Sequence, residues 1–105
     1  MKDYILVLTT LNKEDDAYKI ARTLVEERLA ACITVLPSGT SFYWWKEKIE
    51  KEKEHVLLVK TKKNMYNRLE ERVRDLHPYE IPEIIAVPIV KGFKKYLNWI
   101  NREVF

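Results

Sequence analysis

Residues 77–83 concentrate side chains that could bind a metal ion or carry protons. The segment reads His77-Pro78-Tyr79-Glu80-Ile81-Pro82-Glu83, with one imidazole, one phenol and two carboxylates. Each proline fixes its own φ and disfavours helical geometry at the preceding residue, so the backbone here is stiff. Imidazole and carboxylate ligands suit Cu(II), zinc and similar borderline ions rather than Cu(I). We therefore single out His77, Glu80 and Glu83 as candidate metal ligands.

Structural roles compete with this chemistry. His77 follows a predicted helix, where a protonated imidazole would interact with the helix dipole and cap free carbonyls. One histidine and two acids on a short segment do not close a tetrahedral site, so a subunit interface would have to supply the remaining ligands. Tyr79 is interpreted as a packing aromatic rather than a general acid, because no nucleophile or base is identifiable beside it. Cys32, the only cysteine, lies in an apolar run where cysteines are usually inert, and His55 is expected to be solvated.

Length and composition bound the class of protein. A chain of 105 residues is predicted to form a single domain over residues 1–105. Hydrophobic residues make up 47% and charged residues 33%, as in soluble globular proteins. The apolar run that ends at Thr9 is too short to span a membrane and no cleavage site follows it, so we expect a cytoplasmic protein. An abundance of Lys and Glu with only two glycines suggests a thermostable protein.

The sequence lacks the features that are typical of nucleic-acid-binding proteins and of several enzyme classes. The net charge is only +3 and basic residues are interleaved with acidic ones, so we expect no nucleic acid partner. The aromatic-glycine signature of RNA-binding sheets is absent as well. The sequence contains no GxGxxG, P-loop, GxSxG or CxxC motif, and we predict that the protein is not an enzyme.

The hydrophobic pattern of the first third predicts a strand, a helix and a second strand. The first strand covers residues 4–10, and Asn12 is the expected N-cap of a helix over 13–30. The second strand covers 31–36. We expect it to be broken by Pro37-Ser38-Gly39, because this sequence is typical of a turn.

A hairpin is predicted in the middle of the chain. Residues 42–45 have β-type composition, Lys46-Glu47-Lys48 forms the expected tip, and the charged run 49–54 leads into an apolar strand at 56–59. Glutamates alternate with lysines along the charged run, so the two charges lie on opposite faces of the strand. We interpret this segment as a solvated, ion-pairing arm that projects beyond the core.

The C-terminal half is predicted to form a helix, a strand and a tail helix, over residues 65–76, 84–90 and 93–100. Thr61 or Asn64 lies near the start of the helix, and Pro78 ends it. Pro88 cannot donate a ladder hydrogen bond, so its strand is an edge strand or carries a bulge. The order β-α-β-β-α-β plus a tail helix is that of an α+β, ferredoxin-like split βαβ sandwich.

Both faces of the predicted sheet are apolar. Leu6 and Val7 point to opposite faces, as do Leu57 and Leu58. The two helices of this fold cover one face, which leaves the second face to the tail helix or to another subunit. An exposed patch of this kind would exceed the few hundred Å² that soluble monomers normally tolerate. We therefore expect an oligomer.

Several segments, in this order, resemble the CutA divalent-cation tolerance family: Glu27-Arg28-Leu29-Ala30-Ala31-Cys32, Ser41-Phe42-Tyr43-Trp44-Trp45, Lys60-Thr61, the 77–83 block and Tyr96-Leu97-Asn98-Trp99. The resemblance covers nearly the whole chain. It implies a ferredoxin-like fold assembled as a homotrimer, and a non-enzymatic binder or sensor of divalent metal ions such as copper. The overall design is similar to that of the PII signalling proteins. The alternative is therefore a PII-like trimeric signalling or adaptor protein that binds a small molecule or a protein partner.

The chain departs from the family pattern at two places. The family usually has a glycine in the hairpin where this chain has Glu47. A copper site described in the family uses a cysteine in the first strand and a His-His pair before the proline, where this chain has Thr9 and Leu76-His77. The thiolate that favours Cu(I) is missing, so we expect Cu(II) or another divalent cation at His77 rather than that particular site.

Overall fold

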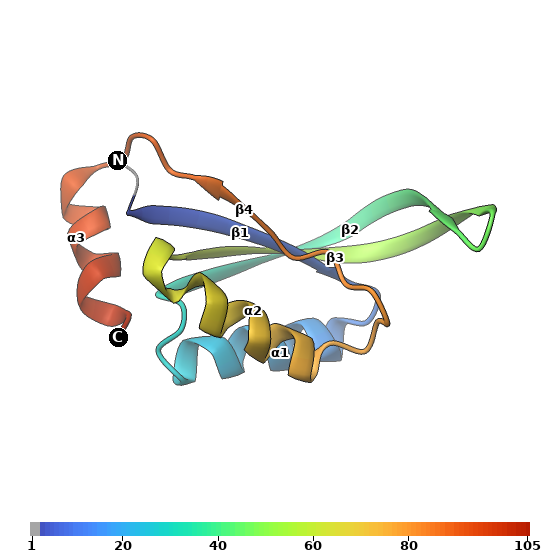
Figure 1. Ribbon diagram of the computed structural model, residues 1–105, viewed down its shortest axis with the longest axis horizontal. Helices are drawn as coiled ribbons and strands as arrows, with labels where there is room; N and C mark the ends of the chain where they lie inside the picture. The colour runs from blue at the N-terminus through green and yellow to red at the C-terminus, as the bar shows by residue number, and fades with distance from the viewer. Residues whose placement is uncertain (1–2) are drawn as a thin grey trace.

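The structure, a computed structural model, describes residues 3–105. In this part of the chain four strands form one antiparallel sheet in the order β2-β3-β1-β4, α1 and α2 lie along one face, and α3 lies at one end (Figure 1). The elements are β1 (Tyr4–Leu11), α1 (Glu14–Glu26), β2 (Cys32–Trp45), β3 (Lys48–Lys62), the 3-10 turn η1 (Lys63–Met65), α2 (Tyr66–Leu76), β4 (Ile85–Pro88) and α3 (Lys94–Glu103). The predicted ferredoxin-like α+β fold is confirmed.

The hydrophobic core lies between the sheet and the two helices. Alternate residues of β1 and β3, among them Val7, Leu57 and Val59, point toward the helices and are fully buried. The helices meet them with residues at helical spacing, and these are also buried: Ile20, Leu24, Leu69 and Val73. This packing positions the C-terminal end of α2 over the sheet. The connector of residues 77–83 begins at that end.

The opposite face of the sheet is also apolar. Leu8 pairs with Leu58 across β1 and β3, and with Ile85 across β1 and β4, so all three share this face. Leu36 and Ile85 are exposed. The tail helix α3 packs at one end of the sheet, where Leu97 and Ile100 are buried, and leaves the rest open (Figure 1). The predicted pair of apolar faces is confirmed.

Strands β2 and β3 continue beyond the body of the molecule as a two-stranded arm, residues 40–53 (Figure 1). The arm ends in a two-residue turn at Lys46 and Glu47, which both have positive φ, 49° and 66°. These are the values of a type I′ turn, which glycine and asparagine normally occupy. The pairing of β2 with β3 thus holds Lys46 and Glu47 in a backbone conformation that their side chains disfavour. No described residue of the arm forms an ion pair, so the predicted ion-pairing role of its charges is wrong.

Two predicted interruptions and boundaries differ from the structure. Pro37-Ser38-Gly39 does not break β2; it forms a bulge at which Ser38 has a φ of 63° and pairing with β3 resumes. The predicted helix 13–30 ends at Glu26, because Arg28 adopts a left-handed φ of 62° and turns the chain back toward the sheet.

Helix starts also differ from expectation. The N-cap of α1 is Lys13 rather than Asn12, and no side chain caps it; three acidic residues in its first turn complement the dipole instead. Thr61 belongs to β3, where its hydroxyl donates a hydrogen bond of 2.7 Å to the Leu29 carbonyl. Helix α2 therefore begins only after η1, at Tyr66.

Strand β4 is an edge strand, as Pro88 predicts, although it is shorter than the predicted 84–90. The Ile89 N–H donates to the Tyr4 carbonyl on β1. Because bonded and non-bonded positions alternate along an antiparallel pair, the backbone of Pro88 faces away from β1. The backbone nitrogen of Pro88, which carries no hydrogen, thus faces the free edge of the sheet.

Candidate functional site

His77 lies at the C-cap of α2 and is buried between the end of that helix and β1. Its Nε2 lies 2.8 Å from the Thr10 carbonyl, and its Nδ1 lies 3.1 Å from the backbone nitrogen of Tyr79. A backbone N–H can only donate, so Nδ1 accepts and carries no proton; Nε2 therefore holds the proton and donates it to Thr10. Both ring nitrogens of a neutral imidazole are thereby engaged.

Tyr79 links the connector to the base of the arm. Its hydroxyl donates a hydrogen bond of 2.7 Å to Oε2 of Glu54, a residue only 5% exposed. The Tyr79 ring also packs edge-on against the His77 ring, with 4.6 Å between centroids. The expected packing role of Tyr79 is therefore accompanied by a hydrogen bond that satisfies a buried carboxylate.

The surroundings favour uncharged forms of both rings. Burial lowers the pKa of His77 from 6.5, although the Thr10 carbonyl and the charges of Glu54 and Asp16 act in the opposite direction. Burial, followed by the hydrogen bond to Glu54, raises the pKa of Tyr79 well above its usual range. At neutral pH the cluster thus consists of a neutral imidazole and a protonated phenol, so the dipole-capping role considered for a charged His77 does not apply.

The other two candidate ligands lie apart from this cluster. Glu80 and Glu83 are exposed on the same connector. Within residues 3–105 no group of three or more His, Cys, Asp or Glu side chains is placed to hold a metal ion. A metal at Nδ1 of His77 would displace the Tyr79 N–H bond, since both use the same lone pair. The donors of one chain in this conformation therefore do not fit a closed metal centre.

Two contributors to this cluster escape sequence reasoning. Glu54 was assigned to the solvated arm, and alternation places it with Val56 and Leu58 on the open face of the sheet, so no sequence pattern indicates that it is buried beside Tyr79. The Thr10 carbonyl is a backbone group, so no pattern of side chains in the sequence predicts that it accepts a hydrogen bond from His77. The cluster anchors the connector to β1 through His77 and to Glu54 through Tyr79.

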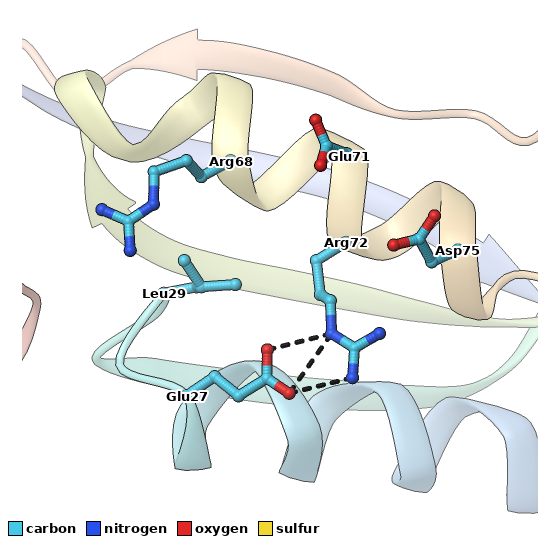
Figure 2. Close-up of a pocket in the computed structure, with 6 residues that line it drawn as sticks. All are labelled: Glu27, Leu29, Arg68, Glu71, Arg72 and Asp75. Carbon is cyan, nitrogen blue, oxygen red and sulfur yellow. Dashed lines mark hydrogen bonds and ion pairs between the residues drawn. The ribbon is translucent and has the colours of Figure 1, made fainter.

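A second polar cluster lies in a shallow cavity of about 230 Å³ between α1 and α2 (Figure 2). There the guanidinium of Arg72 donates to both oxygens of Glu27, at 2.9 to 3.2 Å. That hydrogen bond lowers the pKa of Glu27. In Figure 2 the two side chains meet across the gap between the helices. This bidentate ion pair joins the end of α1 to α2, so Glu27 of the family-like segment has a structural role.

An apolar groove of about 660 Å³ lies between the start of α2 and the edge strand β4. Its walls include Ile5, Tyr66 and Val87, with Lys63 at its margin. Hydrophobic walls with a few polar groups are typical of small-molecule sites. The groove is open to solvent, and no candidate residue from the connector lines it.

Cys32 and His55 are less isolated than the sequence indicates. Cys32 is half-buried, and its thiol lies against Tyr96, whose pKa is raised by burial and by that contact. His55 is half-buried rather than solvated, and its Nε2 lies 4.0 Å from Glu14. Within residues 3–105 no helix is long and apolar enough to cross a membrane.

Comparison with known proteins identifies the family. The model of the CutA1 divalent ion tolerance protein family matches residues 5–103. The chain is 47% identical to the divalent-cation tolerance protein CutA of Thermus thermophilus, over 91% of this chain and 93% of that protein. It is 39% identical to the protein of the same name from Pyrococcus horikoshii, over 94% and 96% of the two chains.

Solved structures agree with the sequence comparison. The structure of the divalent cation tolerance protein from Thermus thermophilus superposes with a TM-score of 0.95 at 44% identity, covering 97% of this chain and 99% of that one. The resemblance carried by the five sequence segments is thereby confirmed. The chain belongs to the CutA1 divalent ion tolerance protein family.

Proposed function

We propose that this chain assembles as a homotrimer that binds divalent cations, copper among them, and that carries out no chemical reaction of its own. The observation that carries the assembly is the open apolar face of the sheet, on which Leu36 and Ile85 are exposed. Family membership supports the interaction with divalent cations.

The candidate ligands favour a site completed across a subunit boundary. Glu80 and Glu83 are exposed, and neither forms an ion pair with any residue of the described range 3–105 that coordination would have to break. His77 can join them only by exchanging its Tyr79 N–H bond for the metal. Carboxylates with one imidazole suit Cu(II) or zinc, and a second subunit would supply the missing ligands.

Isothermal titration of the metal-free protein with Cu(II) and with Zn(II) tests this proposal. The double substitution Glu80→Gln and Glu83→Gln removes two charges without disturbing the core, and we expect at least about a tenfold loss of affinity. Glu71→Gln, on the exposed surface of α2, is the matched control and should bind as the parent does. Absence of saturable binding, or equal binding by the double variant, would contradict the assigned site.

The apolar groove favours a second candidate function, a PII-like adaptor that binds a small molecule. Its volume of about 660 Å³ is in the range of ligand pockets. Substitution of Val87 by Glu would place a charge in the groove. A small molecule found in a thermal-shift screen should lose its stabilising effect in this variant, whereas metal binding at the connector should persist.

A further inference from the structure

The net positive charge of the chain is concentrated in its C-terminal segment. Residues 84–105 contain four basic residues and a single acidic one, Glu103, so their formal charge equals the +3 of the whole chain. The carboxylate of Glu103 is already paired with Arg28, at 2.8 Å. No further carboxylate side chain of this segment is therefore available to the lysines.

Three of these basic residues flank an exposed aromatic ring where α3 begins. Lys91, Lys94 and Lys95 are exposed, and the side chain of Phe93 between them is 73% exposed. None of the three lysines forms an ion pair in the described part of the chain. We call Lys91, Phe93, Lys94 and Lys95 the basic patch. It combines positive charge with apolar surface.

The backbone of the basic patch is anchored to the body of the molecule. Gly92 packs so closely on α3 that a Cβ at this position would lie 3.0 Å from a side-chain carbon of Leu97, which is buried. The carbonyl of Phe93 accepts hydrogen bonds from the N–H groups of Tyr96 and Leu97. Phe93 is therefore exposed on a firmly held turn of chain, with little ordering left to pay on binding.

The position of the basic patch suits contact with an extended negative surface. The molecule extends 44 Å along its longest axis, and α3 forms the end opposite the arm (Figure 1). The first turn of α3 contains no acidic residue, so the positive end of the helix dipole adds to the potential of the lysines. The patch thus presents charge and a ring at one end of an elongated molecule.

We infer that the basic patch binds the surface of a membrane that contains anionic lipids. Lysine ammonium groups are attracted to such a surface, and an aromatic side chain beside them enters the boundary between headgroups and acyl chains. Phe93 inserts at that depth, and Lys91, Lys94 and Lys95 contact the headgroups. The contact holds the protein on the membrane without spanning it. The inference goes beyond the proposed binding of cations and does not depend on it.

Cosedimentation with lipid vesicles tests the inference, in a buffer with a chelator that removes divalent cations. The protein should bind vesicles of phosphatidylcholine with about 30% phosphatidylserine but not vesicles of phosphatidylcholine alone. Binding should weaken as the ionic strength rises, because salt screens the lysines. The triple substitution Lys91→Glu, Lys94→Glu and Lys95→Glu should weaken binding by at least about a hundredfold. Phe93→Ser retains every charge and should weaken it by at least about tenfold.

A matched control changes the net charge by the same amount elsewhere. Lys13→Glu with Lys19→Glu and Arg74→Glu reverses three exposed charges on or beside α1 and α2, and this variant should bind as the parent does. Equal losses in the two triple variants, or full binding by Phe93→Ser, would overturn the inference. Failure of the unmodified protein to bind the anionic vesicles would overturn it without any question of a folding defect. If the protein then binds a short DNA duplex, the patch is a nucleic-acid surface instead.

Discussion

The connector and the arm meet at Glu54 but are stabilised in opposite ways. In the connector, His77 uses both ring nitrogens and Tyr79 satisfies a buried carboxylate. In the arm, Phe42 and Trp44 are 67% and 72% exposed, and the turn holds two residues in left-handed geometry. The two rings of the connector find their partners within one chain, whereas the aromatic side chains of the arm are exposed.

This difference shows that stiffness and chemistry need to be separated when a polar segment is interpreted. The prolines and ring contacts of the connector explain its rigidity without a metal ion. The arm has as many ligand-type residues as the connector, three in each, but it exposes large aromatic side chains, and the bulge between Leu36 and Gly39 marks where it begins. Substitutions in the two regions should therefore affect the free energy of unfolding differently.

Replacement of His77 by Ala should have the largest effect on stability. It removes two hydrogen bonds, leaves the Tyr79 N–H without its acceptor and opens a cavity, at a cost of about 3 kcal/mol. Urea denaturation at fixed protein concentration measures it. His55→Ala, which removes a half-buried ring 4.0 Å from Glu14, should cost much less. Equal losses for the two histidines would contradict the assigned role of His77.

Tyr79→Phe should rank second. Loss of the hydroxyl leaves the buried Glu54 carboxylate without its donor, and a hydrogen bond to a charged group contributes about 2 kcal/mol. Tyr66→Phe is the comparison, because its hydroxyl donates to the Ile84 carbonyl at the longer distance of 3.3 Å and the Glu70 carboxylate beside it is not buried; its loss should cost about 1 kcal/mol or less. If the order of the two tyrosines were reversed in denaturation experiments, Glu54 would not be the important partner.

Glu47→Gly in the arm should raise stability, opposite in sign to both connector variants. A side chain at positive φ costs about 1 kcal/mol, and glycine removes that cost. Glu47→Ala keeps the Cβ and should give no comparable gain, which separates backbone strain from charge. Thermal unfolding of both variants measures the difference, and a destabilised glycine variant would show that the turn is not strained.

The pH dependence should be the smallest effect. The pKa of His77 lies below 6.5 in the folded protein, so the unfolded chain binds the proton more readily. The contribution of His77 is therefore fully present above pH 6.5 and declines as the pH falls through the lowered folded pKa. Urea denaturation between about pH 7.5 and about pH 5.5, above the range of ordinary carboxylates, measures it. His77→Ala should lack this component.

Local sequence patterns predict the elements and the connector because they reflect burial and backbone restriction. Alternation and helical spacing locate the sheet and the helices, and the prolines identify the stiff segment and the edge strand. Local patterns do not predict the hydrogen-bond partner of Tyr79. Glu54 lies 25 positions away, and only the folded sheet brings the two residues together. The turn at Lys46 and Glu47 likewise follows from strand pairing and not from the preference of its residues. The metal ligands and the trimer stay predictions.

The orientation of Pro88 affects how the protein behaves at high concentration. An exposed sheet edge can act as a template on which another chain adds strand by strand, as in amyloid growth. On the free side of β4 the ring of Pro88 replaces the donor that an incoming strand would need. Pro88 thus deprives a strand that would add to this edge of one of its backbone donors, which disfavours edge-to-edge growth.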